Sequence, residues 1–216
     1  SKYEKRAISD RVATCYLEKC IQCGKCSQLC PHAVIRMNVL TAEQADAARE
    51  QGIKVVPMKT PEFGPDMYFT LNISPADCTG CYLCVHNCPV KALDMVLSAT
   101  VAENQKSFDA AVNLPEFDRA KLNLNIPKHV ELLPHYFEFP GACAGCGETP
   151  YIKMLSHLFG DRMVVANATG CSSIYGANLP TTPWTTDANG RGPAWSNSLF
   201  EDNAESGLGL HVGVDK

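Results

Sequence analysis

The pattern of hydrophobic and polar positions in the first half of the chain predicts a short helix followed by two short strands. Residues 41–51 (TAEQADAAREQ) have the composition of a helix, with Thr41 as the N-cap and Gln44 completing a capping box. Two apolar runs follow, residues 53–58 (IKVVPM) and 67–73 (MYFTLNI), and a segment containing Pro and Gly separates them. This pattern is typical of two strands joined by a turn.

In the second half, the pattern predicts a helix, then a strand, then a loop. Residues 149–160 (TPYIKMLSHLFG) predict a helix with Thr149 as the N-cap. Its predicted apolar face consists of Ile152, Leu155 and Phe159. Residues 162–173 (RMVVANATGCSS) predict a short strand that runs into a small-residue loop carrying Cys171. This order is typical of an α/β domain, in which ligands gather at the carboxyl ends of strands.

Two regions show little periodicity. Residues 99–140 contain no cysteine and several prolines, so we expect a linker that leads to a new domain. Residues 176–210 are rich in Gly, Pro, Asn and Thr and predict a long ordered loop leading to a helix. The chain begins without Met and finishes at LHVGVDK with no obvious closing helix, so we expect a piece of a longer polypeptide.

Composition and charge narrow the class of protein. The 216 residues are 45% hydrophobic, which is enough for a buried core, and the formal net charge is -4. The basic residues are scattered, which argues against a nucleic-acid partner. No apolar run approaches the roughly 18 residues of a membrane span, and the N-terminus lacks a secretion signal. We therefore expect a cytoplasmic protein without a membrane partner.

The twelve cysteines carry the candidate chemistry. Thiols stay reduced in the cytoplasm, so metal ligation is a better expectation than disulfides. Eleven of them fall into three sets: Cys20, Cys23, Cys26 and Cys30; Cys78, Cys81, Cys84 and Cys88; and Cys143, Cys146 and Cys171. Cys15 stands apart from these sets.

The first two sets form an internal repeat, CIQCGKCSQLCP and CTGCYLCVHNCP. Spacers of two residues let three thiolates of one loop converge on one cube, while the backbone N–H groups turn toward the sulfurs. The fourth cysteine ligates the other cluster. The spacing thus predicts two crossed 4Fe-4S sites: Cys20, Cys23 and Cys26 with Cys88, and Cys78, Cys81 and Cys84 with Cys30. Gly24 and Gly80 suit loops that bend closely around a cube.

Zinc sites remain the alternative, although these more usually present separated ligand pairs. His32 and His86 lie beside cluster cysteines and are expected to be solvated rather than to tune a cluster. Cys15 is expected to be a buried or free thiol and not a ligand.

The third set has three cysteines and one notable neighbour. The predicted helix–strand–loop order places Cys171 where it could meet Cys143 and Cys146. Glu148 lies at the start of the predicted helix, where a carboxylate is electrostatically favoured. From the residues alone, Glu148 is either a first-turn acid or a cofactor contact.

Two resemblances follow from these motifs. Residues 12–98 resemble the bacterial two-cluster ferredoxins. The two cysteine runs, together with GACAGCGETPYIKMLSHLFGDRM, ANATGCSSIYG and GPAWSNSLFEDNAE, make nearly the whole chain similar to the pyruvate:ferredoxin (flavodoxin) oxidoreductases.

The second resemblance implies a fold and a function. The fold would be an α+β ferredoxin-like domain at residues 1–125, with an insert at about 31–77 as a docking surface, then the first part of an α/β thiamine-diphosphate-binding domain at 126–216. Cys143, Cys146 and Cys171 would hold a third 4Fe-4S cluster, and Glu148 and Cys171 would line the thiamine diphosphate pocket. A homodimeric parent enzyme would convert pyruvate and coenzyme A to acetyl-CoA and CO2. Electrons would pass from thiamine diphosphate and Mg2+ through the clusters to ferredoxin or flavodoxin.

The chain departs from the family pattern in ways that limit this expectation. It contains no later cysteine as a fourth ligand of the third cluster, and the Gly-Asp-Gly motif that carries the metal ion is absent. The domains that bind the 2-oxoacid are also absent, so the piece alone is not expected to catalyse the whole reaction. Two alternatives are a self-standing two-cluster electron carrier or redox-complex subunit, and a zinc-binding interaction module.

Overall fold

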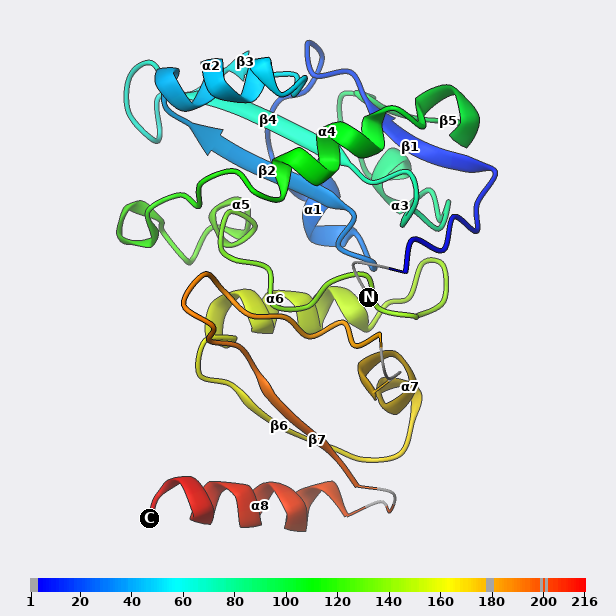
Figure 1. Cartoon of the computed structure of the whole chain (residues 1–216), viewed down its shortest axis with the longest axis vertical. Helices are drawn as coiled ribbons and strands as arrows, with labels where there is room; N and C mark the ends of the chain where they lie inside the picture. The colour runs from blue at the N-terminus through cyan, green and yellow to red at the C-terminus, as the bar shows by residue number, and fades with distance from the viewer. Residues whose placement is uncertain (1–3, 178–180, 199, 201) are drawn as a thin grey trace.

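The residues that the structure describes fold into a mixed α/β arrangement with three small sheets. The computed structural model describes residues 4–177, 181–198, 200 and 202–216. In the first sheet, β1 (Arg11–Cys15) pairs antiparallel with β5 (Leu93–Leu97). The second sheet has the order β2 (Ile35–Leu40), β4 (Tyr68–Ile73), β3 (Val56–Pro57). The third joins β6 (Val164–Asn167) and β7 (Ala194–Asn197) in parallel (Figure 1). No helix in the described part of the chain is long and apolar enough to cross a bilayer.

The predicted insert forms the antiparallel second sheet and one covering helix. β2 (Ile35–Leu40) pairs with β4 (Tyr68–Ile73) along its whole length. α2 (Ala42–Glu50) begins as predicted, because Thr41 caps it and the capping box with Gln44 is complete. The strand predicted at residues 53–58 is shorter, because only β3 (Val56–Pro57) pairs with β4. Pro57 has no N–H to donate, which restricts this strand to the edge of the sheet.

The prediction of a linker at residues 99–140 is wrong in part, because this region contains a helix that lies over the second sheet. α4 (Asn104–Ala111) crosses β2 and β4 (Figure 1), with a 3-10 turn, η1 (Ser98–Val101), before it. Phe108 and Ala111 are the buried residues of α4. A helix with two buried positions shows no repeated apolar stripe in the sequence. After it come the 3-10 turn η2 (Arg119–Lys121) and α5 (Pro127–Val130).

The second half contains the predicted helix, strand and final helix, with two further elements. α6 (Thr149–Phe159) begins one residue earlier than predicted, with Glu148 and not Thr149 at the N-cap, and β6 (Val164–Asn167) follows. Cys171 is the first residue of α7 (Cys171–Ala177) rather than a loop residue. The region predicted as a long loop contains β7 (Ala194–Asn197), and α8 (Asn203–Val214) continues into the segment where no closing helix was expected.

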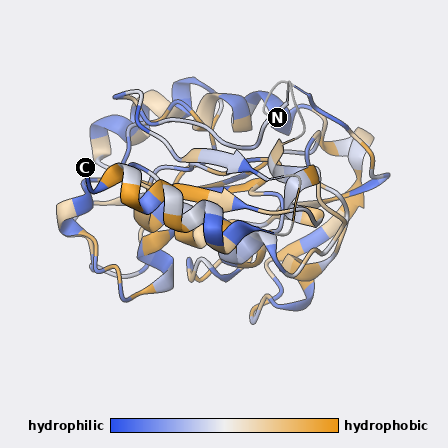
Figure 2. Cartoon of the chain, turned by 90° about the horizontal axis from the view of Figure 1, so that it is seen from below, coloured by the Kyte–Doolittle hydropathy of each residue, from blue (hydrophilic) through white to orange (hydrophobic). Residues whose placement is uncertain are grey.

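The predicted buried face of α6 is wrong. Leu155 and Phe159 are 48% and 45% exposed, whereas the buried residues of the helix are Thr149, Lys153, Ser156 and His157. The polar face packs toward α1 (Lys25–Leu29) and α5 because Lys153 finds a buried partner there, Glu131. On the far side, α8 lies nearest the viewer in Figure 2 and carries hydrophobic residues on its outer surface, including Leu208 and Val214. Apolar surface therefore faces outward on both helices.

The core of the cysteine-rich half extends into the second half. Its buried residues include Val12, Ile35, Phe69 and Phe108, together with Leu132 and Phe139 from beyond the predicted boundary near residue 126. The segment that leads to Cys143 is thus packed against the cysteine-bearing loops.

Candidate metal centres

Eight cysteines line two small cavities, four in each. One cavity is lined by Cys30, Cys78, Cys81 and Cys84, and the other by Cys20, Cys23, Cys26 and Cys88. Each cavity is small, with a volume of about 20 Å³. Each therefore combines three cysteines of one run with the fourth cysteine of the other run. We call them the Cys30 cavity and the Cys20 cavity.

The backbone conformation is the same at equivalent positions of the two cysteine runs. Three pairs of equivalent positions have positive φ: Gln22 and Gly80 (60° and 68°), Gly24 and Tyr82 (75° and 65°), and Ala33 and Lys91 (54° and 50°). The sequence singled out only the two glycines. At Gly80 a Cβ would come within 2.9 Å of the Arg11 carbonyl oxygen, so this glycine is required by contact as well as by φ.

Backbone N–H groups point at the sulfurs, as the spacing predicts. Gln22 N–H donates to Cys20 Sγ at 3.3 Å, and Ala92 N–H donates to Cys88 Sγ at 3.2 Å. The equivalent N–H groups of Gly80 and Val34 lower the pKa of Cys78 and Cys30, although burial outweighs them. These donors favour thiolate sulfur.

The electrostatics of the cavities fit bound cationic centres. Burial raises the pKa of the thiols of Cys26, Cys30, Cys78 and Cys84, for Cys84 to about 12. Buried thiolates therefore require a cation, and coordination to a metal deprotonates such thiols outright. Two sets of four cysteines in apolar walls match the donor set of 4Fe-4S cubes. In the described ranges, no three or more Cys, His, Asp or Glu side chains converge on a point that would hold a single metal ion.

Cys15 lies at the end of β1, next to the Cys20 cavity but not in its wall. A hydrogen bond from the Cys15 thiol outweighs burial and lowers the pKa of Cys20 to about 6. The same contact, together with burial, raises the pKa of Cys15. Cys15 therefore stays protonated and acts as a hydrogen-bond donor to Cys20.

The prediction that His32 is solvated is wrong, whereas His86 is exposed as expected. His32 is 3% exposed, with Nε2 2.9 Å from the Ala142 carbonyl oxygen and Nδ1 3.3 Å from Thr79 Oγ1. Burial lowers the pKa of the imidazole. Because Ala142 precedes Cys143 and Thr79 follows Cys78, His32 connects the Cys30 cavity to the third set.

The third set lies beside the Cys30 cavity. A turn joins Cys146 N–H to the Cys143 carbonyl oxygen, and a Cβ added at Gly145 in this turn would lie 3.7 Å from Cys81 Cβ.

Tyr175 on α7 lies near the other two predicted site residues, Cys171 and Glu148. The pKa of the Tyr175 hydroxyl is raised, mainly by burial and further by the nearby Glu148 carboxylate, Cys146 and Cys171. The hydroxyl makes no hydrogen bond of regular geometry. Cys143, Cys171 and Glu148 are exposed.

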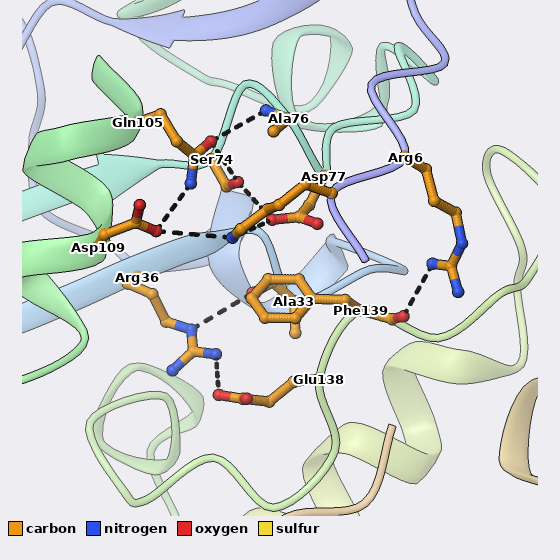
Figure 3. A network of polar contacts seen from close by, with 11 residues as sticks. Arg6, Ala33, Arg36, Ser74, Ala76, Asp77, Gln105, Asp109, Glu138 and Phe139 are labelled. Carbon is orange, nitrogen blue, oxygen red and sulfur yellow. Dashed lines mark hydrogen bonds and ion pairs between the residues drawn. The ribbon is translucent and has the colours of Figure 1, made fainter. Parts of the chain in front are cut away.

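A polar network fastens the approach to Cys143 (Figure 3). Buried Arg36 pairs with Glu138 and also donates from Nε to the Ala33 carbonyl oxygen. Arg6 donates to the Phe139 carbonyl oxygen at 3.2 Å. These contacts fix the third set relative to the Cys30 cavity.

Comparison with known proteins agrees with this geometry. Residues 19–92 match the family model of the 4Fe-4S dicluster domain. The chain is 50% identical over 226 residues to a putative pyruvate-flavodoxin oxidoreductase of Synechocystis sp., which covers 100% of this chain and 19% of the relative. It is 48% identical to the pyruvate-flavodoxin oxidoreductase of Nostoc sp. (100% of this chain, 19% of the relative) and 46% identical to the pyruvate:ferredoxin oxidoreductase of Moorella thermoacetica (100% and 18%). The resemblance noted in the sequence is confirmed, and the chain spans about a fifth of the length of these relatives.

Proposed function

We propose that this chain, which is similar over its whole length to one segment of the pyruvate-flavodoxin and pyruvate:ferredoxin oxidoreductases, is the electron-transfer part of such an enzyme and forms one wall of its cofactor pocket. The observation that carries this proposal is the crossed grouping of eight cysteines in two equal cavities. Each cavity would hold one 4Fe-4S cluster. Such clusters accept and release single electrons without a proton or hydride.

The packing of the chain sets the order in which the three cysteine sets adjoin. The turn at Gly145 contacts Cys81, so the third set neighbours the Cys30 cavity. Cys26 and Cys84 are close enough for each cavity to influence the other, because a charge on Cys84 raises the pKa of Cys26 further. Cys23 is exposed at the end of this series. Electrons would therefore leave from the Cys20 cavity, to ferredoxin or flavodoxin.

The residues around Tyr175 are the basis for proposing that this chain forms one wall of the cofactor pocket. Glu148 and Cys171 both lie near enough to its hydroxyl to raise its pKa, and both are exposed to solvent. They would line the thiamine diphosphate pocket, and Cys143, Cys146 and Cys171 would supply three ligands to a third cluster. No Mg2+ site is assigned within the described residues. Pyruvate and coenzyme A would bind elsewhere in a homodimeric, cytoplasmic enzyme.

The test is pyruvate-dependent reduction of ferredoxin or flavodoxin by the anaerobically purified full-length protein. We expect turnover with coenzyme A, and at least a tenfold loss in Glu148→Gln with unchanged iron content, because a group that contacts the cofactor acts on the reaction rather than on the clusters. Glu103→Gln, at an exposed ion pair with Lys106, is the matched control. A protein that passes electrons from dithionite to the carrier but never responds to pyruvate would instead be a self-standing carrier.

A further inference from the structure

A buried ion pair lies in the seam between α1 and α6, and the proposed function leaves it unused. Lys153 Nζ is 3.1 Å from Glu131 Oε2, and the two side chains are 2% and 1% exposed. Ser27 Oγ lies 2.6 Å from the same carboxylate oxygen. Removing both charges from water costs about as much as their attraction returns, so stability does not explain the pair. Its position relative to the cysteines does.

The positive end of the pair lies against Cys30. The Lys153 ammonium donates to the Ser27 carbonyl oxygen, and the same oxygen accepts the Cys30 backbone N–H at 3.1 Å. Burial raises the pKa of the Cys30 thiol, and the Lys153 charge opposes that rise. The ammonium is therefore one shared carbonyl group away from a residue in the wall of the Cys30 cavity.

The negative end of the pair is held by Ser27 and Lys153. Although burial works against ionisation, the charge of Lys153 and the hydrogen bond from the Ser27 hydroxyl hold the pKa of the Glu131 carboxyl below its usual value. The carboxylate thus stays charged, and it holds the ammonium in place. The lysines near Cys20 differ, because Lys59 is exposed and Lys128 pairs with partly exposed Glu62. Solvent screens them, so a buried lysine acts more strongly on its cavity.

We propose that Lys153 is a positioning residue for electron transfer: a fixed positive charge, held by Glu131 and Ser27, that raises the reduction potential of the centre in the Cys30 cavity. The inference rests on the proposed function. One electron enters this centre from the neighbouring third set and one leaves to the Cys20 cavity, with no proton transferred. Each reduction adds one negative charge, which a nearby cation stabilises in a low-dielectric interior. Lys153 thereby favours transfer out of the third set.

The test is a redox titration of the anaerobically purified full-length protein, followed by electron paramagnetic resonance. Glu131→Gln removes the balancing negative charge, so the potential of one centre should rise. The double variant Glu131→Gln with Lys153→Met removes both charges without leaving an unpaired one, so the same potential should fall below that of the wild type. We expect roughly tenfold changes in the equilibrium constant for reduction, which is about 59 mV for one electron.

Two further variants separate charge from packing. Lys153→Arg keeps the charge and should keep the potential. Lys106→Met removes an exposed lysine and should change nothing. The inference is overturned if the two Glu131 variants shift the potential in the same direction or not at all, or if Lys153→Arg lowers it as far as the double variant does. Wild-type protein without iron and sulfide would refute the proposed function instead, before any potential is compared.

Discussion

At the residue scale, the two cavities assign the last cysteine of each run to the centre that the other run forms. Cys30 belongs to the first run but lines the cavity of the second. We expect Cys30→Ser and Cys78→Ser to give the same paramagnetic resonance spectrum on reduction, because both remove a ligand of one centre. Cys26→Ser should give a different one. If Cys30→Ser resembles Cys26→Ser, the crossed assignment is wrong.

Cys15 provides the control for this series. It donates to Cys20 but lines neither cysteine cavity, so Cys15→Ser should retain about eight irons for two cubes. Loss of about four irons in this variant would make Cys15 a ligand.

His157 should make the fold sensitive to acid. It is fully buried with its ring against His135, and burial lowers its pKa to about 4, with smaller effects from the charges of Glu131, Lys153 and Arg36. The unfolded chain binds this proton below about pH 6.5 and the folded chain does not, so stability is complete above pH 6.5 and falls as the pH drops toward 4. The total loss is about 3 kcal/mol.

Urea denaturation at several pH values checks this expectation. His157→Leu should make the decline in unfolding free energy between pH 6.5 and 5 less steep, whereas His86→Gln, at an exposed position, should leave it unchanged. An equally steep decline in His157→Leu would show that other groups cause it.

At the element scale, the end of α6 is fixed by close contact. A Cβ at Gly160 would lie 2.4 Å from both the Ser156 carbonyl oxygen and the Tyr136 ring. Gly160→Ala should therefore cost about 1–3 kcal/mol of unfolding free energy, as overpacking does. Gly209, within α8, has no atom near its missing Cβ, so Gly209→Ala should stabilise the chain by about 0.5–1 kcal/mol. Thermal melting of both variants tests the contrast, and equal shifts would contradict it.

Local patterns predicted some elements and not others for physical reasons. The capping box fixed α2, because its signals lie within four residues. The orientation of α6 was not readable, because the partner of Lys153 lies 22 residues earlier in the chain. α4 was hidden because its buried surface consists of two residues.

Some residues of the candidate site could be predicted from the sequence, and others could not. The cysteine spacing predicted the crossed grouping, since one short loop brings three thiols together. It did not predict His32, because only the fold places Ala142 and Thr79 on either side of its ring. Tyr175 was also missed, since nothing near it in the sequence marks a polar contact with Glu148.

At the scale of the whole molecule, the three cysteine sets form one connected series across both halves of the chain. His32 and the turn at Gly145 join the third set to the Cys30 cavity, and the Lys153–Glu131 pair joins α6 to α1. α6 and α8 also carry apolar residues that are exposed to solvent. The relatives are about five times longer, and we propose that their further domains cover these residues.

The most direct test of the account is the iron, acid-labile sulfide and zinc content of the anaerobically purified protein. Two crossed cubes predict about eight irons and eight sulfides per chain, and about twelve of each when the third set is also filled. Near-zero iron with bound zinc would contradict it. So would the survival of the same four-iron centre in both Cys30→Ser and Cys26→Ser, because each variant should lose a different centre.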